Sequence, residues 1–426
     1  MTTRPSPLFA SLSVLAMWAL VLGLVVGRPE LFFAAIPLVV ALLSMRKPTA
    51  ASSINLTTVV SSPRLVEGDQ FELTLSVVSP GAPAPSVEVF LPLPATFVFA
   101  GGKRHLVTSL SADEVFEWKF AVRSTARGRF AFGPLNVRLS DHSGLHVAEA
   151  LASSPVEIET YPRIPRIQRL PRPARMRSSF GNYVSAQSGT GLEPAEIRPF
   201  APGDRVRHIN WRTSLRLGRL YVTQFHQERN ADVILLLDTL AETGAHPNSS
   251  LDASVRAVAA LATAFIARKD RVGFLEFGGY LRWLRPAAGR RQLEAVLRSV
   301  IPAAQVFTYA ARNLDYVPAT ALPRQALVIA VSPLIDERFA SAIIDLKGRG
   351  YDVVLLAISP VELTRRVLPD TQLSDVACAL WKLELTTRLR QLRADGITVT
   401  EWHPERPLDV ALASLARRVP LARAAL

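Results

Sequence analysis

Few residues of this chain have the type and spacing that catalysis or metal binding requires. The single cysteine, Cys378, lies in an apolar stretch where no neighbouring base could activate a thiol. His142 and His146 are four residues apart, but Ser143-Gly144 between them indicates a loop and not a helix with both rings on one face. The sequence contains no G-x-x-x-x-G-K-[ST] loop, no H-E-x-x-H and no G-x-S-x-G. We therefore predict a protein that is not an enzyme.

The most distinctive stretch, residues 191–216, combines a tight turn with arginine and tryptophan side chains. Pro202-Gly203-Asp204 is typical of a turn, because proline presets φ and glycine tolerates positive φ. If the chain beyond the turn is extended, Arg207, Ile209 and Trp211 lie on one face. The candidate binding or structural residues of this stretch are Arg198, Pro202, Gly203, Asp204, Arg207, Ile209, Trp211, Ser214 and Arg216.

Two interpretations of this stretch remain open. In the first, the arginines pair with Asp204 or Glu193 and form a buried network that clamps the segment to the following domain. In the second, an Arg/Trp surface is exposed and binds a protein partner. The spacing alone does not decide between them.

Length and composition set limits on the elements that must position these residues. A chain of 426 residues has room for two or three domains at roughly 100–200 residues each. Hydrophobic residues make up 49% and charged residues 20%, which excludes wholesale disorder. One cysteine excludes an intramolecular disulfide framework.

Two uncharged segments precede the rest of the chain. Residues 8–27 are almost wholly apolar, and about 20 such residues at about 1.5 Å rise cover the roughly 30 Å hydrocarbon core of a bilayer. Residues 31–45 are short for a span, but they can cross if Arg46 and Lys47 reach the headgroups and the bilayer thins slightly. We therefore expect residues 1–50 to form a transmembrane hairpin.

The distribution of positive charge favours this hairpin over two alternatives. The hairpin leaves only Arg28 outside, and the other basic residues near the spans stay in the cytoplasm, as the positive-inside rule requires. A cleaved signal peptide needs a small-residue cleavage site, which Leu24-Val25-Val26-Gly27 offers poorly. A single signal anchor would place all later residues outside. We expect an inner-membrane protein whose soluble domains are cytoplasmic.

Residues 51–160 show the alternation of apolar and polar side chains that is typical of β-strands. Every second residue from Phe71 to Val77 is apolar, and residues 87–91 and 115–120 follow the same pattern. Turn-rich pieces separate these segments. Short strands at this spacing predict a β-sandwich-like module, which packs or binds and carries no catalytic group.

A basic linker follows. Residues 161–177 interleave proline with arginine, which favours an extended, semi-rigid connector, and we expect the linker to span residues 161–190. Thirteen arginines against four acidic residues give residues 161–230 a charge of +9. Such a strip could bind anionic membrane lipid, with a binding free energy of about 1 kcal/mol for each basic residue near the surface. The alternative is a solvated connector with internal ion pairs. No nucleic-acid-reading motif accompanies the charge, so we expect no nucleic-acid partner.

Strand and helix patterns alternate over residues 231–426, which predicts a doubly wound α/β domain with a mostly parallel sheet. The unbroken apolar run that precedes Asp238 is typical of a strand buried on both faces. Further strands are expected at 272–277, 326–331, 351–358 and 397–402, and helices at 251–268, 290–300, 336–349, 375–394 and 408–418. The predicted architecture is multidomain, with parts at residues 1–50, 51–160, 161–190, 191–230 and 231–426.

The stretch around Asp204 resembles the bacterial domain-of-unknown-function family 58, whose pattern is roughly R-x-[YF]-x-P-G-D-x-x-R-x-I-x-W-x-x-[SA]-x-R. Ten residues match at this spacing, Phe200 among them. Arg127-Gly128-Arg129-Phe130 and Gly133-Pro134 also resemble the β-rich region of the family, in which an N-terminal membrane hairpin is usual. One departure is Asp141-His142-Ser143-Gly144-Leu145-His146, where the family has D-P-[FL]-G-L-[FY].

The resemblance implies a von Willebrand A-like fold for residues 231–426. Such domains often hold Mg²⁺ at strand ends through D-x-S-x-S, a threonine and a further aspartate. This chain has Asp238-Thr239-Leu240-Ala241-Glu242, without either serine, and Val331-Ser332-Pro333 in place of S-D. Thr308 is the best remaining threonine. Asp238 alone does not make a metal site, so we expect neither Mg²⁺ nor another cofactor, and Asp238 can instead cap the loop that follows it.

The resemblance also implies partners. Members of this family typically act alongside MoxR-type AAA ATPases in assemblies that remodel or mature other proteins. We therefore predict a membrane-anchored, non-catalytic adaptor whose α/β domain and Arg/Trp segment contact the ATPase or its client, which the sequence does not name. The alternative is a structural cell-envelope protein whose β-rich module binds wall or secreted partners. Topology distinguishes the two, because an AAA ATPase is cytoplasmic.

Overall fold

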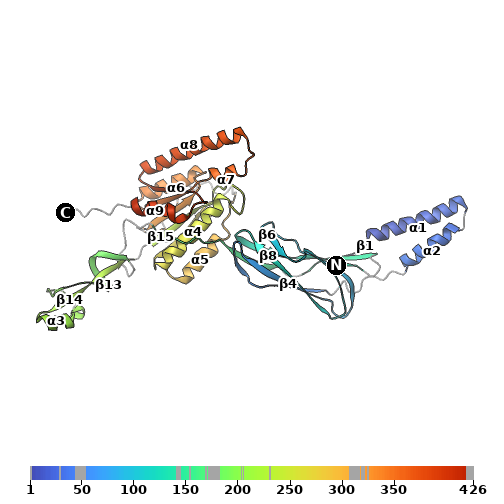
Figure 1. The fold of residues 1–426 in the computed structure, drawn as a ribbon, viewed down its shortest axis with the longest axis horizontal. Coiled ribbons are helices and arrows are strands. Elements are labelled where there is room, and N and C mark those ends of the chain that lie inside the picture. The colour runs from blue at the N-terminus through green and yellow to red at the C-terminus, as the bar shows by residue number, and fades with distance from the viewer. Residues whose placement is uncertain are drawn as a thin grey trace. The chain divides into compact units, whose positions relative to one another are not determined.

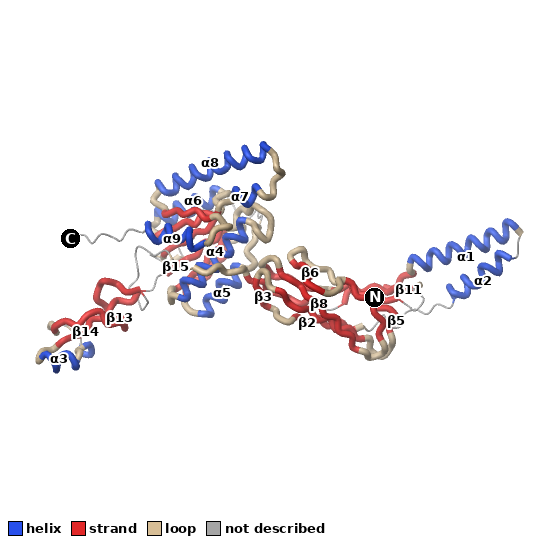
Figure 2. The backbone as a smooth tube through the Cα atoms, in the orientation of Figure 1, coloured by secondary structure: helices blue, strands red, loops and turns tan. Residues whose placement is uncertain are grey.

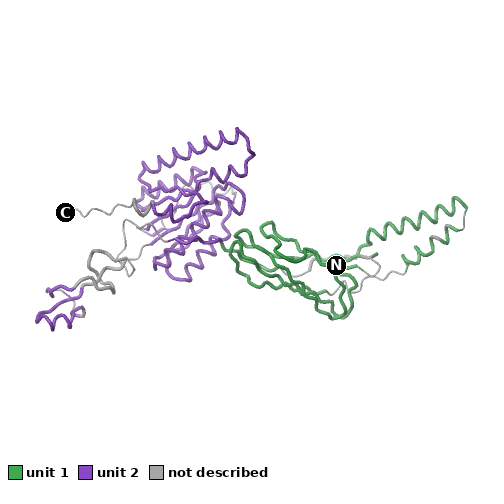
Figure 3. Tube along the Cα trace, viewed as in Figure 1, with its two compact units in different colours: residues 1–161 green, residues 162–426 purple. Residues whose placement is uncertain are grey.

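The structure is a computed structural model that divides into two compact units, residues 1–161 and 162–426 (Figures 1 and 3). The described residues are 2–27, 30–43, 54–140, 145–152, 155–167, 170, 183–202, 204, 206–229, 232–306, 317, 322–323 and 326–418.

The first unit begins with a short strand and two apolar helices, β1 (Thr2–Pro5), α1 (Pro7–Val26) and α2 (Glu30–Leu43). The side chain of Ser6 caps α1 by accepting the Phe9 N–H at 3.2 Å, and proline occupies the first turn, where its missing N–H costs nothing. The two helices lie side by side (Figure 1). Small buried residues, Ala16 and Gly23 on α1 and Ala35 on α2, allow a close approach of the kind that membrane helices use.

Helix α1 is long and apolar enough to cross a membrane. Within the part of the chain that the structure describes, α4 (Ser250–Ala267) passes the same test, but α4 is a largely buried helix of the second unit. Helix α2 is 14 residues long and contains Pro37. The candidate membrane segment is therefore α1, with α2 packed along it.

Strand β1 ties the chain ahead of α1 to the β-rich part that follows α2. It pairs antiparallel with β11 (His146–Ala152), with Thr2 opposite Glu149 and Pro5 opposite His146. The backbone N–H of Ser6 also donates to the carbonyl of Leu145 at 2.9 Å. Both ends of the helical hairpin therefore join one folded module.

That module consists of β-strands (Figure 2). A five-stranded sheet has the order β1-β11-β10-β5-β7, a four-stranded sheet β2-β4-β8-β6 and a three-stranded sheet β3-β12-β9. Alternate residues of β4 are buried, as the sequence predicts, and Leu73 and Val77 join Val89, Val122 and Leu139 in one apolar core. The other strands are β2 (Asn55–Val60), β3 (Arg64–Val66), β4 (Gln70–Val78), β5 (Ala84–Phe90), β6 (Phe97–Gly101), β7 (His105–Leu110), β8 (Val115–Ser124), β9 (Gly128–Phe132), β10 (Leu135–Ser140) and β12 (Val156–Tyr161).

The region predicted as a linker is only in part a connector. Ile164, Ile167 and Leu170 pack against the core of the α/β domain, so apolar residues between the prolines hold this stretch to the domain surface. Residues 168–169 and 171–182 lie outside the described residues. Residues 183–190 belong to strand β13 (Tyr183–Pro199), which pairs antiparallel with β14 (Tyr221–Arg229) in a two-stranded sheet.

The rest of the second unit is an α/β domain around a six-stranded sheet of order β17-β16-β15-β18-β19-β20. Five strands are parallel, and the edge strand β17, which the sequence analysis did not predict, runs antiparallel to β16. The strands are β15 (Asp232–Asp238), β16 (Arg271–Phe277), β17 (Leu281–Ala287), β18 (Leu327–Ser332), β19 (Asp352–Ile358) and β20 (Thr398–Trp402).

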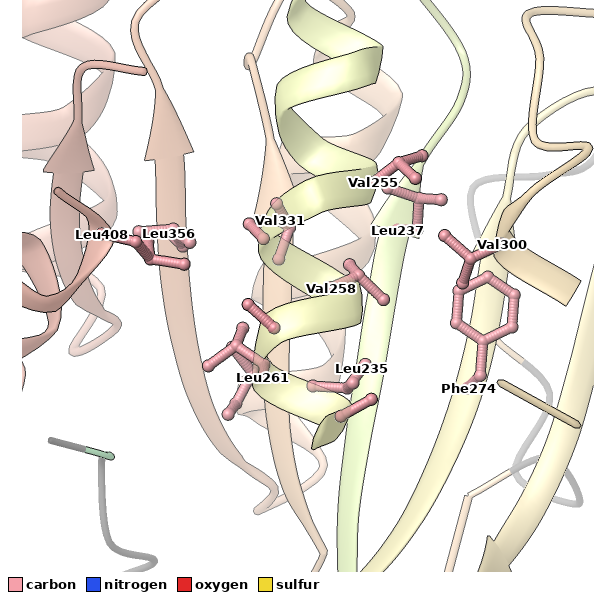
Figure 4. Packing of buried hydrophobic residues seen from close by; sticks show 14 of the residues in the cluster. Leu235, Leu237, Val255, Val258, Leu261, Phe274, Val300, Val331, Leu356 and Leu408 are labelled. Atoms are coloured by element: carbon pink, nitrogen blue, oxygen red, sulfur yellow. The ribbon is translucent and has the colours of Figure 1, made fainter. Parts of the chain in front are cut away.

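Helices cover both faces of this sheet. Leu235 and Leu237 of β15 pack against α4, α5 (Arg290–Val300) and α9 (Leu408–Arg418) on one face (Figure 4). Ile234 and Leu236 point the other way, toward α6 (Glu337–Gly348) and α8 (Gln372–Ala394). A strand buried on both faces explains its unbroken apolar sequence. Short helix α7 (Val361–Arg365) follows β19.

The order of the strands creates a topological switch point between β15 and β18. From β15 the chain first moves to β16 on one side, and it later returns to β18 on the other. Ligands of doubly wound sheets bind at the carboxyl ends of such strands. Asp238 and Ser332 are the last residues of these two strands.

Candidate functional site

The segment singled out by the sequence lies at the end of the β13–β14 hairpin, where an arginine and an aspartate form a fork. Arg198 donates from both terminal nitrogens to the Asp204 carboxylate, at 2.8 and 2.7 Å. The Ala201 N–H donates to the same carboxylate at 2.8 Å. These hydrogen bonds, with that from Arg198 the strongest, hold the pKa of Asp204 below its ordinary value.

The predicted turn is present. The Asp204 N–H donates to the Ala201 carbonyl at 3.0 Å, which closes a four-residue turn with Pro202 at its second position. Of the predicted ion pairs, the structure shows that between Arg198 and Asp204. Gly203 and the side chains of Glu193 and Arg207 lie outside the described residues.

Beyond the turn the chain is helical, so the extended segment on which Arg207, Ile209 and Trp211 would share one face is not formed. A short 3-10 turn, η2 (Val206–His208), leads to helix α3 (Trp211–Leu217). Asn210 favours the helix over an extended chain, because its side chain accepts the Thr213 N–H at 3.1 Å and so caps α3. The same side chain donates to Thr223 of β14 at 3.2 Å.

Two further residues hold α3 against β14. The hydroxyl of buried Ser214 accepts the Tyr221 N–H at 2.8 Å. Ile209 forms an isolated bridge with Val222. Ser214 and Ile209 therefore have structural roles, and the outer side of α3 is left to solvent.

That outer side forms a surface of apolar and basic side chains, here called the tip surface: Val206, Trp211, Arg212, Leu215, Arg216, Leu217, Arg219 and Leu220, all exposed. Trp211 is 59% and Leu215 82% exposed, and their spacing of four residues puts them on one side of the helix. The sequence contains no acidic residue between 205 and 227. Large apolar side chains ringed by arginine are typical of the central residues of protein interfaces.

Replacing Asn210 with alanine is expected to weaken α3 by about 1 kcal/mol, because it removes the helix cap and the bond to β14. Trypsin should then cleave after Arg212 and Arg216 several times faster than in the unaltered chain. The matched control is Thr213→Ala, since Thr213 contributes its backbone N–H to the cap. Equal cleavage of both variants would contradict the role given to Asn210.

A second polar site lies at the carboxyl edge of the α/β sheet. Asp238 is 1% exposed; one of its oxygens accepts the Ser332 hydroxyl at 2.5 Å and the other accepts the Leu240 N–H at 2.9 Å. Burial raises the pKa of Asp238 to about 7, and the two hydrogen bonds only partly offset this effect. Asp238 therefore caps the loop that begins at Leu240.

Other polar groups at this edge were not found from the sequence, because they belong to no known motif, and Glu362 and His403 are 41 positions apart in the chain. Glu362 accepts the Ser359 hydroxyl at 2.6 Å and lies 3.3 Å from Nδ1 of His403. Nδ1 of His246 lies 2.9 Å from the buried carboxylate of Asp252, which belongs to the capping box of α4. Among these groups, no nucleophile stands beside a free base in the described part of the chain.

The residues at this edge do not fit a Mg²⁺ site. Octahedral Mg²⁺ needs several oxygen ligands, but Leu240 and Glu242 stand where serines are expected and Pro333 follows Ser332. With a pKa of about 7, Asp238 is also partly protonated near neutral pH, which weakens it as a ligand for a cation. Thr308 lies outside the described residues.

The remaining candidates offer no reactive group. Cys378 is a free, buried thiol on α8. His142 and the side chain of His146 lie outside the described residues.

Comparison with known proteins supports the family. Residues 196–403 match the model of a family described as "Protein of unknown function DUF58". The match begins in β13 and takes in the tip surface and the α/β domain through β20.

Similar proteins cover only parts of this chain. An uncharacterized protein of Mycobacterium tuberculosis is 29% identical over 28% of this chain, and the uncharacterized protein YeaD of Bacillus subtilis 23% over 33%. The aligned parts span 39% and 37% of those two proteins. Of solved structures, the cupredoxin domain of amoB from Nitrosocaldus yellowstonii covers 26% of this chain and 87% of its own, with 10% identity and a TM-score of 0.20, too low to assign a fold.

Proposed function

We propose that this chain is a membrane-anchored, non-catalytic adaptor that binds a MoxR-type AAA ATPase through the tip surface and works with it in protein remodelling or maturation. The exposure of Trp211 and Leu215 within an arginine-rich surface is the observation that carries the proposal. It favours the partner-binding interpretation of this segment over a buried clamp. The partner surface that fits is an apolar pocket with an acidic rim.

The pairing of β1 with β11 supports a two-span anchor. Strand β1 precedes α1 and β11 follows α2, yet the two strands share hydrogen bonds along one sheet edge. A segment of chain whose two ends meet on one side of a bilayer must cross it an even number of times. If α1 crosses, α2 crosses back, and the positive-inside rule then places the β-rich module in the cytoplasm beside the ATPase.

The strand order supports a von Willebrand A-like fold for the α/β domain. Numbering the strands of the sheet along the chain gives 3-2-1-4-5-6, with the third strand antiparallel at the edge. Three sheets that share one apolar core likewise support a β-sandwich-like first module. Neither proposal assigns a reaction to this chain, and ATP chemistry belongs to the partner.

The test is binding of the purified MoxR-type ATPase from the same genome to the full chain in lipid nanodiscs, with ATP and with ADP. Trp211→Ser combined with Leu215→Ser should weaken binding about 30-fold or more, as loss of a central interface residue does. Val107→Ser is the control, because Val107 is a 60% exposed apolar residue of the β-rich module. No binding by the unaltered chain in either nucleotide would refute the partner, and equal binding by all three chains would refute the tip surface.

A second function is favoured by a groove on the five-stranded sheet. This groove of about 720 Å³ is lined by Phe90, Asn136, Glu149 and the linked polar side chains of Glu88, His105 and Arg138. His105 and Arg138 lie 2.6 and 3.7 Å from the Glu88 carboxylate. In a structural envelope protein, this face would bind wall or secreted partners. That function requires the β-rich module to lie outside the cytoplasm, whereas the adaptor function requires it inside. A measurement of membrane topology would therefore exclude one of the two functions.

A further inference from the structure

Helix α8 carries an exposed apolar stripe that its own domain does not cover. Leu373, Val376, Leu380 and Leu383 are 79%, 51%, 64% and 64% exposed. Their spacing of three, four and three residues places them along one side of the helix, over about three turns. The opposite side provides the contacts with the domain, through Ser374, Cys378 and Leu385. A row of large apolar side chains at coiled-coil spacing indicates a helical partner.

We propose that this stripe, residues 373–383 of α8, is a dimer interface at which α8 packs antiparallel against α8 of a second copy of this chain. The spacing is the same in both directions along the helix, so a twofold axis beside residue 378 brings each apolar residue opposite another. Leu373 of one copy then meets Leu383 of the other, and Val376 meets Leu380. Self-complementarity of this kind is what an isologous interface requires.

The residues beside the stripe fit the same arrangement. Ala377 and Ala379 are exposed and flank its centre, where small side chains let two helices approach closely.

The end of the stripe limits the interface to the first half of α8. Beyond Leu383, the same side of the helix continues with Thr387 and Gln391, while Leu389 and Leu392 turn into the domain core. An interface of this length is small for partners that meet in dilute solution. Copies held in one membrane meet at a much higher effective concentration, which lowers the affinity that dimerisation needs.

The first experiment measures the mass of the full chain in detergent and in nanodiscs. The unaltered chain should be a dimer at concentrations where Leu380→Glu is a monomer, with a dissociation constant raised roughly 30-fold or more. Val410→Glu, at a 63% exposed site on α9, is the matched control and should remain a dimer. A monomeric unaltered chain, or a dimer that survives Leu380→Glu, would overturn the proposal.

Disulfide cross-linking tests the register. In a Cys378→Ser background, differently tagged chains with Val376→Cys and with Leu380→Cys should form a mixed disulfide on oxidation. Each variant alone should cross-link far less. Efficient linking of Val376→Cys to itself would mean a parallel pair and would refute the twofold arrangement.

The interface is independent of the proposed adaptor function. Leu380→Glu should still bind the ATPase, and the Trp211→Ser, Leu215→Ser chain should still dimerise. A failure of the dimer interface can therefore be distinguished from a failure of the adaptor function. Loss of ATPase binding in Leu380→Glu would identify the stripe as the ATPase contact and refute its assignment to a second copy.

Discussion

Replacing Asp238 with asparagine is expected to stabilise the α/β domain at pH 8 and to remove most of the change in its stability between pH 4 and pH 7. Asp238 is buried, and its pKa of about 7 in the folded chain compares with an ordinary value of 3.8 for an aspartate carboxyl group. The folded state therefore binds this proton more tightly than the unfolded state does. The stability that the neutral carboxyl provides is complete below pH 3.8 and is lost as the pH rises through 7.

The size of the effect follows from the same two pKa values. At 1.36 kcal/mol for each pKa unit, the ionised carboxylate costs the domain as much as roughly 4 kcal/mol above pH 7. Asparagine has the same shape and stays neutral. Its oxygen can accept the Leu240 N–H and its amide can donate to the Ser332 hydroxyl, so both contacts of Asp238 are kept in a new form.

Hydrogen exchange of the amides of β15 at pH 5 and pH 8, corrected for intrinsic rates, measures this local stability. In the unaltered chain, the domain should be less stable at pH 8 than at pH 5. In Asp238→Asn, the domain should have nearly the same stability at both pH values. The control is Asp336→Asn on the same edge, where hydrogen bonds from Arg338 lower the pKa of the carboxyl, so the pH dependence has the opposite sign. An Asp238→Asn domain that is less stable than the unaltered one at pH 8 would contradict the argument.

The elements of the α/β domain could be predicted because their apolar patterns are local. The strand ending at Asp238 shows in its unbroken apolar run, and α5 and α9 begin and end where the spacing predicts. Strand β17 was missed because most of its residues are exposed or half-buried at a sheet edge, where the apolar signal is weak. The helical tip was missed for a similar reason, since a single side chain, Asn210, caps a helix of seven residues.

The sites depended on contacts that no local pattern encodes. The bond between Ser332 and Asp238 joins residues 94 positions apart, and it exists because β15 and β18 are neighbours in the sheet. The sequence pattern likewise does not predict that Leu380 is exposed. Both sides of α8 contain leucine at helical spacing, and only packing against β20 and α6 shows which side is covered. Motif spacing paired Arg198 with Asp204 because the two residues are only six positions apart, with the start of one turn between them.

Cysteine labelling in intact cells is expected to place the turn between α1 and α2 outside and the β-rich module inside. In a Cys378→Ser background, Gly27→Cys should react with a membrane-impermeant maleimide, whereas Lys103→Cys, on an exposed loop of the module, should react only after the cells are opened. The physical reason is the pairing of β1 with β11, which holds both ends of the helical hairpin on one side of the bilayer. Labelling of Lys103→Cys from outside would refute the cytoplasmic adaptor and favour the envelope function.

A charge in α2 tests whether the second crossing is required by the fold. Val40→Arg puts a cation on an exposed position of the helix, at a cost of about 2.5 to 3.5 kcal/mol near the centre of a span. If α2 then fails to cross, β1 and β11 come to lie on opposite sides of the membrane and cannot pair. We therefore expect Val40→Arg to expose β11 and the strand beside it, β10, to proteases, while the α/β domain stays resistant. Val40→Leu is the control, and an intact β-rich module in Val40→Arg would show that the pairing does not depend on a second crossing.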